Sequence, residues 1–214
     1  MPSKLIIWGA SGHARVVADI IRVAGTYEIA GFLDDQHPEH SGHQFEGATI
    51  LGGRECLAAQ RARGIAHLVV AFGHCAGRLE AARFATGAGF MLATAIHPSA
   101  VIAASTRVGA GSVIAANAVV NPYATIGENA IINTSASVDH DCAIDEGVHI
   151  APGAHLSGRV RVGAASWIGA GATIIDGCSV GSNTIIGAGA VVVDDIPSDV
   201  IAYGVPARVI RRNE

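Results

Sequence analysis

The chain has 214 residues, a formal net charge of −4 at pH 7 and 15% charged residues. Lys4 is the only lysine, so the sequence excludes a GxxxxGKS or GxxxxGKT phosphate loop and a catalytic lysine deep in the chain. The slightly acidic balance gives no general electrostatic reason to bind nucleic acid or an anionic membrane. Hydrophobic residues make up 50% but aromatic residues only 5%, which favours a regular, closely stacked backbone over a bulky core.

The first 96 residues alternate between strand-like and helix-like segments. The predicted strands are Lys4–Trp8, Glu28–Leu33, Ile50–Leu51, His67–Ala71 and Phe90–Ala95, and the predicted helices are Ala14–Ala24, Arg54–Arg63 and Arg78–Gly87. This alternation is typical of a small parallel α/β sheet of Rossmann type. Such a sheet binds its ligand at the carboxyl ends of its strands.

Three loops follow strands in this part and supply the candidate ligand-binding residues. They are Ser11–His13, Asp34–Asp35 and Gly73. Backbone N–H groups at the start of a helix favour a phosphate, and a carboxylate can accept a hydrogen bond from a ribose or a base. The loop after the first strand reads GxxGH and departs from GxGxxG, so it does not predict NAD. Taken alone, the loop is also compatible with a tight glycine turn that binds nothing.

Neither a metal site nor a disulfide is predicted. The stretch His37–His43 is rich in histidine, but its spacing fits no regular ligand set, so we interpret it as a polar surface loop. The four cysteines show no CxxC spacing and are expected to be reduced thiols in packing positions.

A six-residue repeat dominates the second half of the sequence. From Ile102 to Val192 every sixth residue is Ile, Val or Leu, and the residue two positions earlier is mostly Ala, Ser or Cys. A repeat of this period predicts a parallel β-helix built from hexapeptides, with three hexapeptides in each triangular coil. Each aliphatic residue then points inward and stacks on its equivalent eighteen residues away.

The phase of the repeat also assigns the outward residues to faces and corners. His149 lies on one face and His155 on the next, whereas His140 lies on the corner opposite the face of His149. Gly158 is placed one coil above His140. Cys142 and Cys178 are two coils apart, roughly 9–10 Å at the usual strand spacing, which is too far for a disulfide.

Several motifs together carry a resemblance to a known family. They are GASGH (Gly9–His13), FLDD (Phe32–Asp35), hexapeptides beginning near IHPSA (Ile96–Ala100), INTSASVDHDC (Ile132–Cys142), GVHIAPGA (Gly147–Ala154) and GVPARVI (Gly204–Ile210). Over nearly its whole length the chain resembles the NeuD/PglD-type acetyltransferases of nucleotide-activated amino sugars, which include the bacillosamine-pathway and perosamine N-acetyltransferases. The resemblance implies a Rossmann-like nucleotide-sugar-binding domain at residues 1–96. It also implies a left-handed β-helix that binds acetyl-CoA at residues 97–214.

The resemblance also implies roles for individual residues. His140 corresponds to the general base, Asp141 to the acid that raises its basicity, and His149, Ala170 and Ala188 to contacts with acetyl-CoA. The implied substrate contacts are Ser11, Gly12, His13, Asp34, Asp35 and Gly73. The family often has glutamate where this chain has the shorter Asp141.

The residues themselves agree with this chemistry. An imidazole can remove the proton of an attacking amine near neutral pH, and a neighbouring carboxylate fixes its tautomer. The backbone N–H of Gly158 is our candidate for holding the thioester oxyanion, and His155 is expected to be an exposed histidine without a role.

Two other function classes remain open on the sequence alone. The first is a zinc hydratase of the gamma carbonic anhydrase type, for which His140, His149 and His155 are sufficient in number. Their spacing does not match the H-x4-H pair usual in those enzymes, which also lack an N-terminal sheet domain. The second is a non-catalytic hexapeptide-repeat scaffold. The leading prediction is an acetyl-CoA-dependent sugar N-acetyltransferase without a metal, acting in polysaccharide biosynthesis.

The phase of the repeat further predicts the assembly. His149, Ala170 and Ala188 form one strip, and the packed core separates them from His140 of the same chain. We therefore expect a homotrimer whose active sites are shared between chains, with the outward apolar residues Ile131, Trp167 and Ile185 partly buried there. No signal peptide or membrane segment is recognised, so the protein is expected in the cytoplasm.

Overall fold

The computed structural model describes residues 2–213, which divide into two compact units between Pro98 and Ser99. Within the described residues, no helix is long and apolar enough to cross a membrane.

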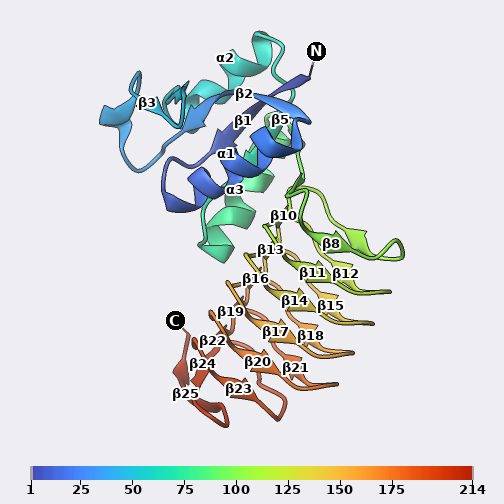
Figure 1. The fold of residues 1–214 in the computed structure, drawn as a ribbon. Coiled ribbons are helices and arrows are strands. Elements are labelled where there is room, and N and C mark those ends of the chain that lie inside the picture. Colours follow the sequence, from blue (N-terminus) through green and yellow to red (C-terminus); the bar gives the residue numbers. More distant parts are fainter. Residues whose placement is uncertain (1, 214) are drawn as a thin grey trace. The chain divides into compact units, whose positions relative to one another are not determined.

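The first unit is built on a four-stranded parallel sheet in the order β2-β1-β5-β6 (Figure 1). Its elements are β1 (Ser3–Trp8), α1 (Gly12–Ala24), β2 (Tyr27–Leu33), η1 (Pro38–His40), β3 (Gln44–Phe45), β4 (Ala48–Thr49), η2 (Arg54–Cys56), α2 (Leu57–Ala62), β5 (His67–Val70), α3 (Cys75–Gly87), β6 (Met91–Leu92) and β7 (Ala95–Ile96). The parallel α/β sheet of Rossmann type is thereby confirmed.

Three local predictions in this unit need correction. Ile50 makes a single bridge to Phe32 instead of starting a strand, and it follows the β3–β4 hairpin that the sequence pattern did not reveal. The helix expected from Arg54 onward divides into the short η2 and α2. The last strand, expected over Phe90–Ala95, is interrupted: Met91–Leu92 form β6 in this sheet, and Ala95 belongs to the separate β7. In each case the paired or helical residues form a shorter run than the apolar pattern that suggested it.

Apolar periodicity explains the central elements of this sheet. Leu5, Ile6 and Ile7 of β1 are fully buried because helices cover both faces of a parallel sheet. Helix α1 ends at Gly25, whose positive φ of 66° lets its N–H reach the carbonyl of Ile21. Position 9 requires glycine for a different reason: a Cβ there would lie 2.7 Å from the carbonyl oxygen of Ala71. The turn after β1 can therefore pass close to the end of β5.

The second unit is a parallel β-helix with three sheets, which Figure 1 shows as a ladder of short strands. The β16 sheet contains β10 (Val113–Ile114), β13 (Ile131–Ile132), β16 (His149–Ile150), β19 (Trp167–Ile168), β22 (Ile185–Ile186), β24 (Val200–Tyr203) and β25 (Arg208–Arg212). The β14 sheet contains β8 (Val101–Ile102), β11 (Val119–Val120), β14 (Ser137–Val138), β17 (His155–Leu156), β20 (Thr173–Ile174) and β23 (Val191–Val192). The β15 sheet contains β9 (Arg107–Val108), β12 (Thr125–Ile126), β15 (Ala143–Ile144), β18 (Arg161–Val162) and β21 (Ser179–Val180).

The register confirms the hexapeptide interpretation. Ile131 pairs with His149 and His149 with Trp167, so equivalent residues are eighteen positions apart, as predicted. From Ile114 to Val192 the predicted inward aliphatic residues are at most 3% exposed, and Ile102 and Val108 of the first coil are partly buried. Burying each such side chain contributes about 2 kcal/mol. The arrangement matches the left-handed β-helix that the resemblance implies.

Of the four cysteines, Cys75, Cys142 and Cys178 are buried, and Cys56 is partly exposed. One predicted surface residue is different: Ile131 is fully buried within the single chain. It therefore does not belong to an exposed apolar strip, whereas Trp167 remains 39% exposed.

Candidate active site

His140 lies on the corner between β14 and β15, in a turn shaped by its neighbours. Its imidazole Nδ1 is 2.8 Å from Oδ2 of Asp141, and both side chains are about half exposed. Asp141 has a φ of +59°, the left-handed conformation that the corner turn requires and that Asp tolerates well. If Nδ1 carries the proton donated to Asp141, Nε2 keeps a lone pair that can accept a proton from a substrate.

Asp139 holds the same turn from the other side. Its Oδ1 accepts hydrogen bonds from the backbone N–H of His140, at 2.7 Å, and from Nδ2 of Asn121, at 2.9 Å. Asn121 belongs to the coil below, so this carboxylate links two coils at the corner. The hydrogen bonds of Asp139 therefore hold the turn that carries the His140 imidazole, although this turn is exposed.

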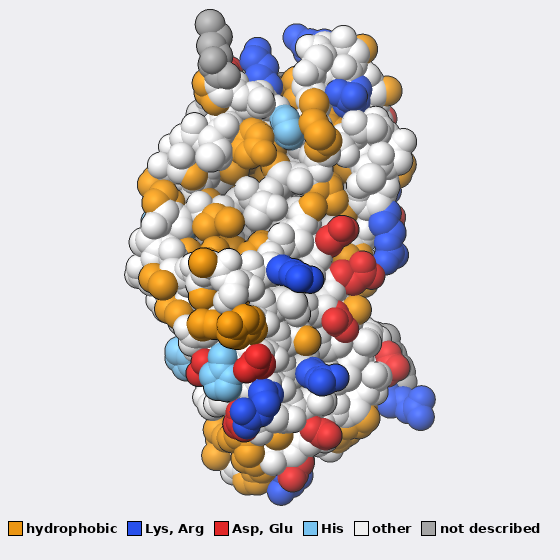
Figure 2. Space-filling view, turned by 90° about the vertical axis from the view of Figure 1, so that its right-hand side faces the viewer, with side chains coloured by type: hydrophobic (Ala, Val, Ile, Leu, Met, Phe, Trp, Pro, Cys, Tyr) orange, Lys and Arg blue, Asp and Glu red, His pale blue; other side chains and the backbone are white. Residues whose placement is uncertain are grey.

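In the coil above His140, a glycine lies next to the imidazole and leaves room for it. A Cβ on Gly158 would lie 2.6 Å from both Cε1 and Nε2 of His140 and 2.9 Å from Oδ1 of Asp176. The Asp176 carboxylate forms an ion pair with Arg159. Charged and histidine side chains gather on this part of the β-helix, seen in the lower half of Figure 2. Gly158 is itself buried, and among residues 2–213 its backbone N–H makes no hydrogen bond to a backbone carbonyl. Its role as an oxyanion donor stays a prediction.

His149 lies in the β16 sheet and is only 6% exposed. Its ring stacks on Trp167 of the next coil, with centroids 5.1 Å apart and an interplanar angle of 19°. Its Nε2 is 3.0 Å from Nδ2 of Asn133, one coil below. The amide therefore fixes the ring orientation, and the exposed edge of Trp167 extends the flat surface outward.

Ala170 and Ala188 stack on the corner that follows the β16 sheet. Both are exposed, and the N–H of Gly189 bonds to the carbonyl of Ala170 at 2.8 Å. Small side chains on this corner leave the backbone open to a ligand that lies along the coils. The corner of His140 is a different one, between the β14 and β15 sheets, so one chain does not bring His140 and this strip together.

His155 lies in the β14 sheet and has a partner of its own. It is exposed on β17, and its Nδ1 is 2.8 Å from the hydroxyl of Ser137. The three histidines considered together as zinc ligands therefore have separate partners: Asp141, Asn133 and Ser137.

The first unit contains a cavity of about 520 Å³ at the carboxyl ends of its strands. Its lining consists of Trp8, Gly9, Ala10, Ser11, Leu33, Asp34, Asp35, Gln36, His37, His40, Arg54, Phe72, His74, Gly77, Glu80 and Ala81. Of the predicted substrate contacts, Ser11, Asp34 and Asp35 line it, whereas Gly12, His13 and Gly73 are not among the lining residues. The cavity lies where the Rossmann-type topology predicts a ligand.

The two aspartates of this cavity already have partners within the chain. Asp34 accepts from the backbone N–H groups of Gln36 and His37, at 3.0 and 3.3 Å. Asp35 accepts from the N–H and Nε of Arg54, at 2.6 and 2.9 Å. The hydrogen bond to Asp35 raises the pKa of Arg54. The carboxylates thus shape the loop, and Asp35 holds a guanidinium at the cavity wall.

Arg54 was not predicted as a site residue. Its guanidinium lies over the ring of Trp8, 5.5 Å from the centroid, and 3.4 Å from Oε1 of Glu80. The only local sign was its place after the glycines at positions 52 and 53. The partners that fix it come from three other elements, so the spacing along the chain could not reveal it.

His13 is held in the neutral form. Burial, and then the positive charge of Arg78, lower the pKa of His13 to about 4. Arg78 is itself fully buried and donates to the carbonyl oxygens of Phe72 and Gly73, at 3.2 and 3.0 Å. Arg78 therefore fixes the turn after β5, and His13 packs at the start of α1 without a charge.

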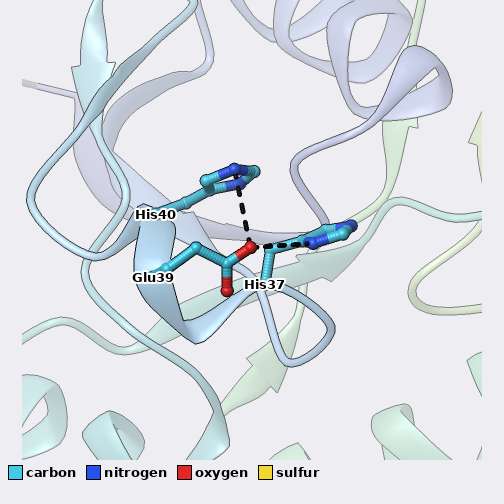
Figure 3. Close-up of side chains that lie close together, drawn as sticks. All are labelled: His37, Glu39 and His40. Carbon is cyan, nitrogen blue, oxygen red and sulfur yellow. Dashed lines mark hydrogen bonds and ion pairs between the residues drawn. The ribbon is translucent and has the colours of Figure 1, made fainter.

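Three side chains of the histidine-rich loop lie close together, which their spacing in the sequence did not indicate. The side chains of His37, Glu39 and His40 come together around η1 (Figure 3). The Nδ1 of His37 is 3.2 Å from Oε1 of Glu39, and the Nε2 of His40 is 4.0 Å from the same oxygen. A hydrogen bond from its own backbone N–H, followed by the contacts with His37 and His40, holds the pKa of Glu39 below its usual value.

Comparisons with known proteins decide the family. Residues 4–83 match the model of the PglD N-terminal domain, and residues 159–194 match that of the bacterial transferase hexapeptide (six repeats). The perosamine N-acetyltransferase PerB from Caulobacter crescentus, solved with CoA and GDP-perosamine, is 39% identical, with 97% of each chain covered and a TM-score of 0.93. The chain belongs to the NeuD/PglD-type family of nucleotide-amino-sugar acetyltransferases.

Two further solved structures are similar to this NeuD/PglD-type chain. The acetyltransferase domain of PglB from Neisseria gonorrhoeae FA1090, solved with acetyl coenzyme A, is 40% identical, covers 98% of this chain and 100% of its own, and has a TM-score of 0.91. WeeI from Acinetobacter baumannii AYE shares the fold at 24% identity and a TM-score of 0.86, over 97% of this chain and 100% of its own. A comparison with curated proteins gave no match.

Membership of the NeuD/PglD-type family argues against the two other function classes that the sequence left open, the zinc hydratase and the non-catalytic scaffold. The similarity to PerB and to the PglB domain covers the N-terminal sheet as well as the β-helix. Neither the zinc hydratase nor the non-catalytic scaffold is favoured, because the solved relatives that match over at least 97% of this chain at 39–40% identity are acetyltransferases.

Proposed function

We propose that the chain transfers an acetyl group from acetyl-CoA to the amino group of a nucleotide-activated amino sugar. A UDP- or GDP-linked 4-amino-4,6-dideoxy sugar is the substrate class we expect, because PerB was solved with GDP-perosamine. The observation that carries the proposal is the contact between His140 and Asp141 on an exposed corner of the β-helix. This pair supplies the base that amide formation needs.

The proposed reaction uses His140 first as a base and then as an acid. As the sugar amine attacks the thioester carbonyl, the imidazole Nε2 removes the amine proton, and Asp141 stabilises the imidazolium. The N–H of Gly158 donates to the oxyanion of the tetrahedral intermediate. When this intermediate collapses, the C–S bond breaks, and the proton on the imidazole goes to the CoA thiolate. The products are the acetamido sugar and free CoA.

The two substrates are proposed to bind to different units. Acetyl-CoA binds along the strip of His149, Ala170 and Ala188, where an ordered ring and two small residues line the coils. The nucleotide binds in the cavity of the first unit, with its phosphates near the start of α1 at Ser11 and Gly12. His13 and Gly73 do not line the cavity, so we propose that they affect binding indirectly, by shaping the turns after β1 and β5.

The active unit is proposed to be a homotrimer with a site between each pair of chains. His140 and the acetyl-CoA strip lie on different corners of one prism, so a second chain must supply one of them. Closed threefold symmetry repeats such a site three times. The role that follows is cytoplasmic N-acetylation of sugar precursors for polysaccharide biosynthesis.

The proposal is tested by incubating the protein with acetyl-CoA and a panel of nucleotide sugars while free thiol is measured. The panel contains GDP-perosamine, a UDP-linked 4-amino-4,6-dideoxy sugar, and the matching 4-hydroxy sugars as controls. We expect thiol release with an amino sugar and a product with the mass of its N-acetyl derivative. Release with the hydroxy sugars alone would indicate O-acetylation, and no release with any acceptor would contradict the proposed function.

A further inference from the structure

The loop after β2 is a compact turn tied to the strand end. Asp34, only 8% exposed, accepts the backbone N–H of His37 at 3.3 Å. Within the turn, the N–H of His40 bonds to the carbonyl of His37 at 2.9 Å, and Pro38 occupies the first position of η1. Pro38 fixes its own φ, and the hydrogen bonds fix the turn around it. The residues on either side of Pro38 are therefore held in a defined relation before any ligand arrives.

Three potential ligand atoms converge on one side of this turn, as Figure 3 shows. Oε1 of Glu39 lies 3.2 Å from Nδ1 of His37 and 4.0 Å from Nε2 of His40. The potential ligand atoms of the three residues all lie within 4.8 Å of one another. Bonds of about 2.0–2.2 Å to a tetrahedral zinc place neighbouring ligand atoms about 3.3–3.5 Å apart. The separations between the ligand atoms therefore have to close by at most about 1.5 Å for the three side chains to surround one ion.

A fourth residue is placed to orient one of these ligands. The Nδ1 of His40 lies 3.6 Å from Oδ2 of Asp34, so the ring directs its other nitrogen toward Glu39. Histidines that bind metals usually donate their second ring N–H to a carboxylate, which fixes the tautomer and the ring plane. The Asp34 carboxylate thus touches both histidines, His37 through its backbone and His40 through its ring.

We propose that His37, Glu39 and His40 bind one divalent transition-metal ion, with Asp34 orienting His40. Two imidazoles and one carboxylate suit Zn²⁺, Ni²⁺ or Co²⁺ and not Mg²⁺ or Ca²⁺, which take oxygen ligands. The three side chains are 42–66% exposed, so the ion enters directly from solvent and water completes its coordination. Asp34, His37 and His40 also line the cavity in which the nucleotide is proposed to bind, so an ion here would lie at the edge of that site. The base role proposed for His140 does not use the ion.

The test uses the full-length protein, stripped of metal with a chelator and then desalted. Zn²⁺ alone is titrated into it by calorimetry, and Co²⁺ is titrated separately while the visible absorption of tetrahedral cobalt is followed. The variants are His37→Ala, His40→Ala and Glu39→Gln. The matched control is His43→Ala, because His43 is exposed in the same loop with its ring 5.7 Å from His40 but is not among the three ligands.

We expect the wild type and His43→Ala to bind one Zn²⁺ per chain at this site. Each ligand variant should bind at least about tenfold more weakly, since even the loss of an outer-shell partner costs roughly 10–100-fold. The proposal is overturned if the double variant His37→Ala/His40→Ala binds Zn²⁺ as the wild type does, if His43→Ala loses as much affinity as the ligand variants, or if no binding is detected. Circular dichroism of each variant establishes that the loop substitutions leave the fold intact.

Discussion

The imidazole Nδ1 of His140 lies 2.8 Å from Oδ2 of Asp141, although this aspartate is one methylene shorter than the glutamate common in the family. The shorter side chain is sufficient because the two residues are adjacent in a corner turn where Asp141 has a φ of +59°. The pair can therefore act as a base and its orienting acid without help from another coil.

Replacing His140 tests this role most directly. We expect His140→Ala to lower kcat by roughly 10²–10⁴-fold, the usual effect of losing a general base. His155→Ala is the control, because His155 is an exposed histidine on the neighbouring β17 with Ser137 as its partner. Steady-state kinetics with saturating acetyl-CoA measure both. Turnover of His140→Ala near the wild-type rate would mean that water or another group deprotonates the amine.

The space beside the imidazole is a second, separate requirement. A Cβ on Gly158 would lie 2.6 Å from Cε1 and Nε2 of His140, and the backbone at Gly158 is one that alanine adopts readily. We expect Gly158→Ala to fold normally and to lower kcat by about 10²-fold, as for a catalytic group displaced by about 1 Å. The control is Gly87→Ala, where the added Cβ meets nothing within 4 Å. An unchanged kcat in Gly158→Ala would show that the imidazole does not need its present position.

The β-helix and the position of His140 could be predicted because both follow from the six-residue repeat along the sequence. A six-residue period places Ile114 and Val192 inward whatever surrounds them, and the same phase puts His140 on a corner. The position of Arg54 at the cavity wall could not be predicted, because Asp35, Glu80 and Trp8 come from separate elements.

Two other features escaped prediction for related reasons. The convergence of His37, Glu39 and His40 depends on a hydrogen-bonded turn that alternating polarity does not indicate. Ile131 was expected on the surface from its outward phase, but the phase says only which way a side chain points. It does not say whether other parts of the chain cover that side chain, and Ile131 is fully buried.

Because His13 is buried in its neutral form, we expect the folded protein to lose stability in acid. The pKa of His13 is lowered from 6.5 to about 4 in the folded protein, so between these pH values the unfolded chain binds a proton that the folded chain does not. The free energy of unfolding therefore falls as the pH decreases through this window, by up to about 3 kcal/mol. Urea unfolding of the wild type and of His13→Gln at pH 7 and pH 4.5 measures the effect.

In that comparison, His13→Gln should lose less stability between the two pH values than the wild type. The control His43→Gln removes an exposed histidine and should keep the wild-type pH dependence. Equal acid sensitivity of His13→Gln and the wild type would mean that burial of His13 does not link folding to protonation.

The start of α1 should affect the binding of only one substrate. Gly12 is exposed, follows Ser11 of the cavity wall, and has no atom within 4 Å of an added Cβ. Gly12→Val should therefore fold but obstruct a phosphate, raising KM for the nucleotide sugar by roughly tenfold while KM for acetyl-CoA stays nearly unchanged. The two KM values come from varying one substrate at a saturating level of the other. An equal rise in both would contradict the assignment of the nucleotide to the first unit.

The shared active site can be tested by mixing two inactive chains. His140 lies on the corner between the β14 and β15 sheets, whereas Ala170 is exposed on the corner after the β16 sheet. A chain carrying His140→Ala lacks the base, and a chain carrying Ala170→Trp has a bulky side chain on the acetyl-CoA strip. If each site takes its base from one chain and its strip from the next, some interfaces in mixed trimers contain both intact halves. Co-expressed, differently tagged chains purified through both tags should then regain activity, whereas each variant alone stays inactive. Mixed assemblies that remain inactive, or light scattering that shows an active monomer, would exclude a site built from two chains.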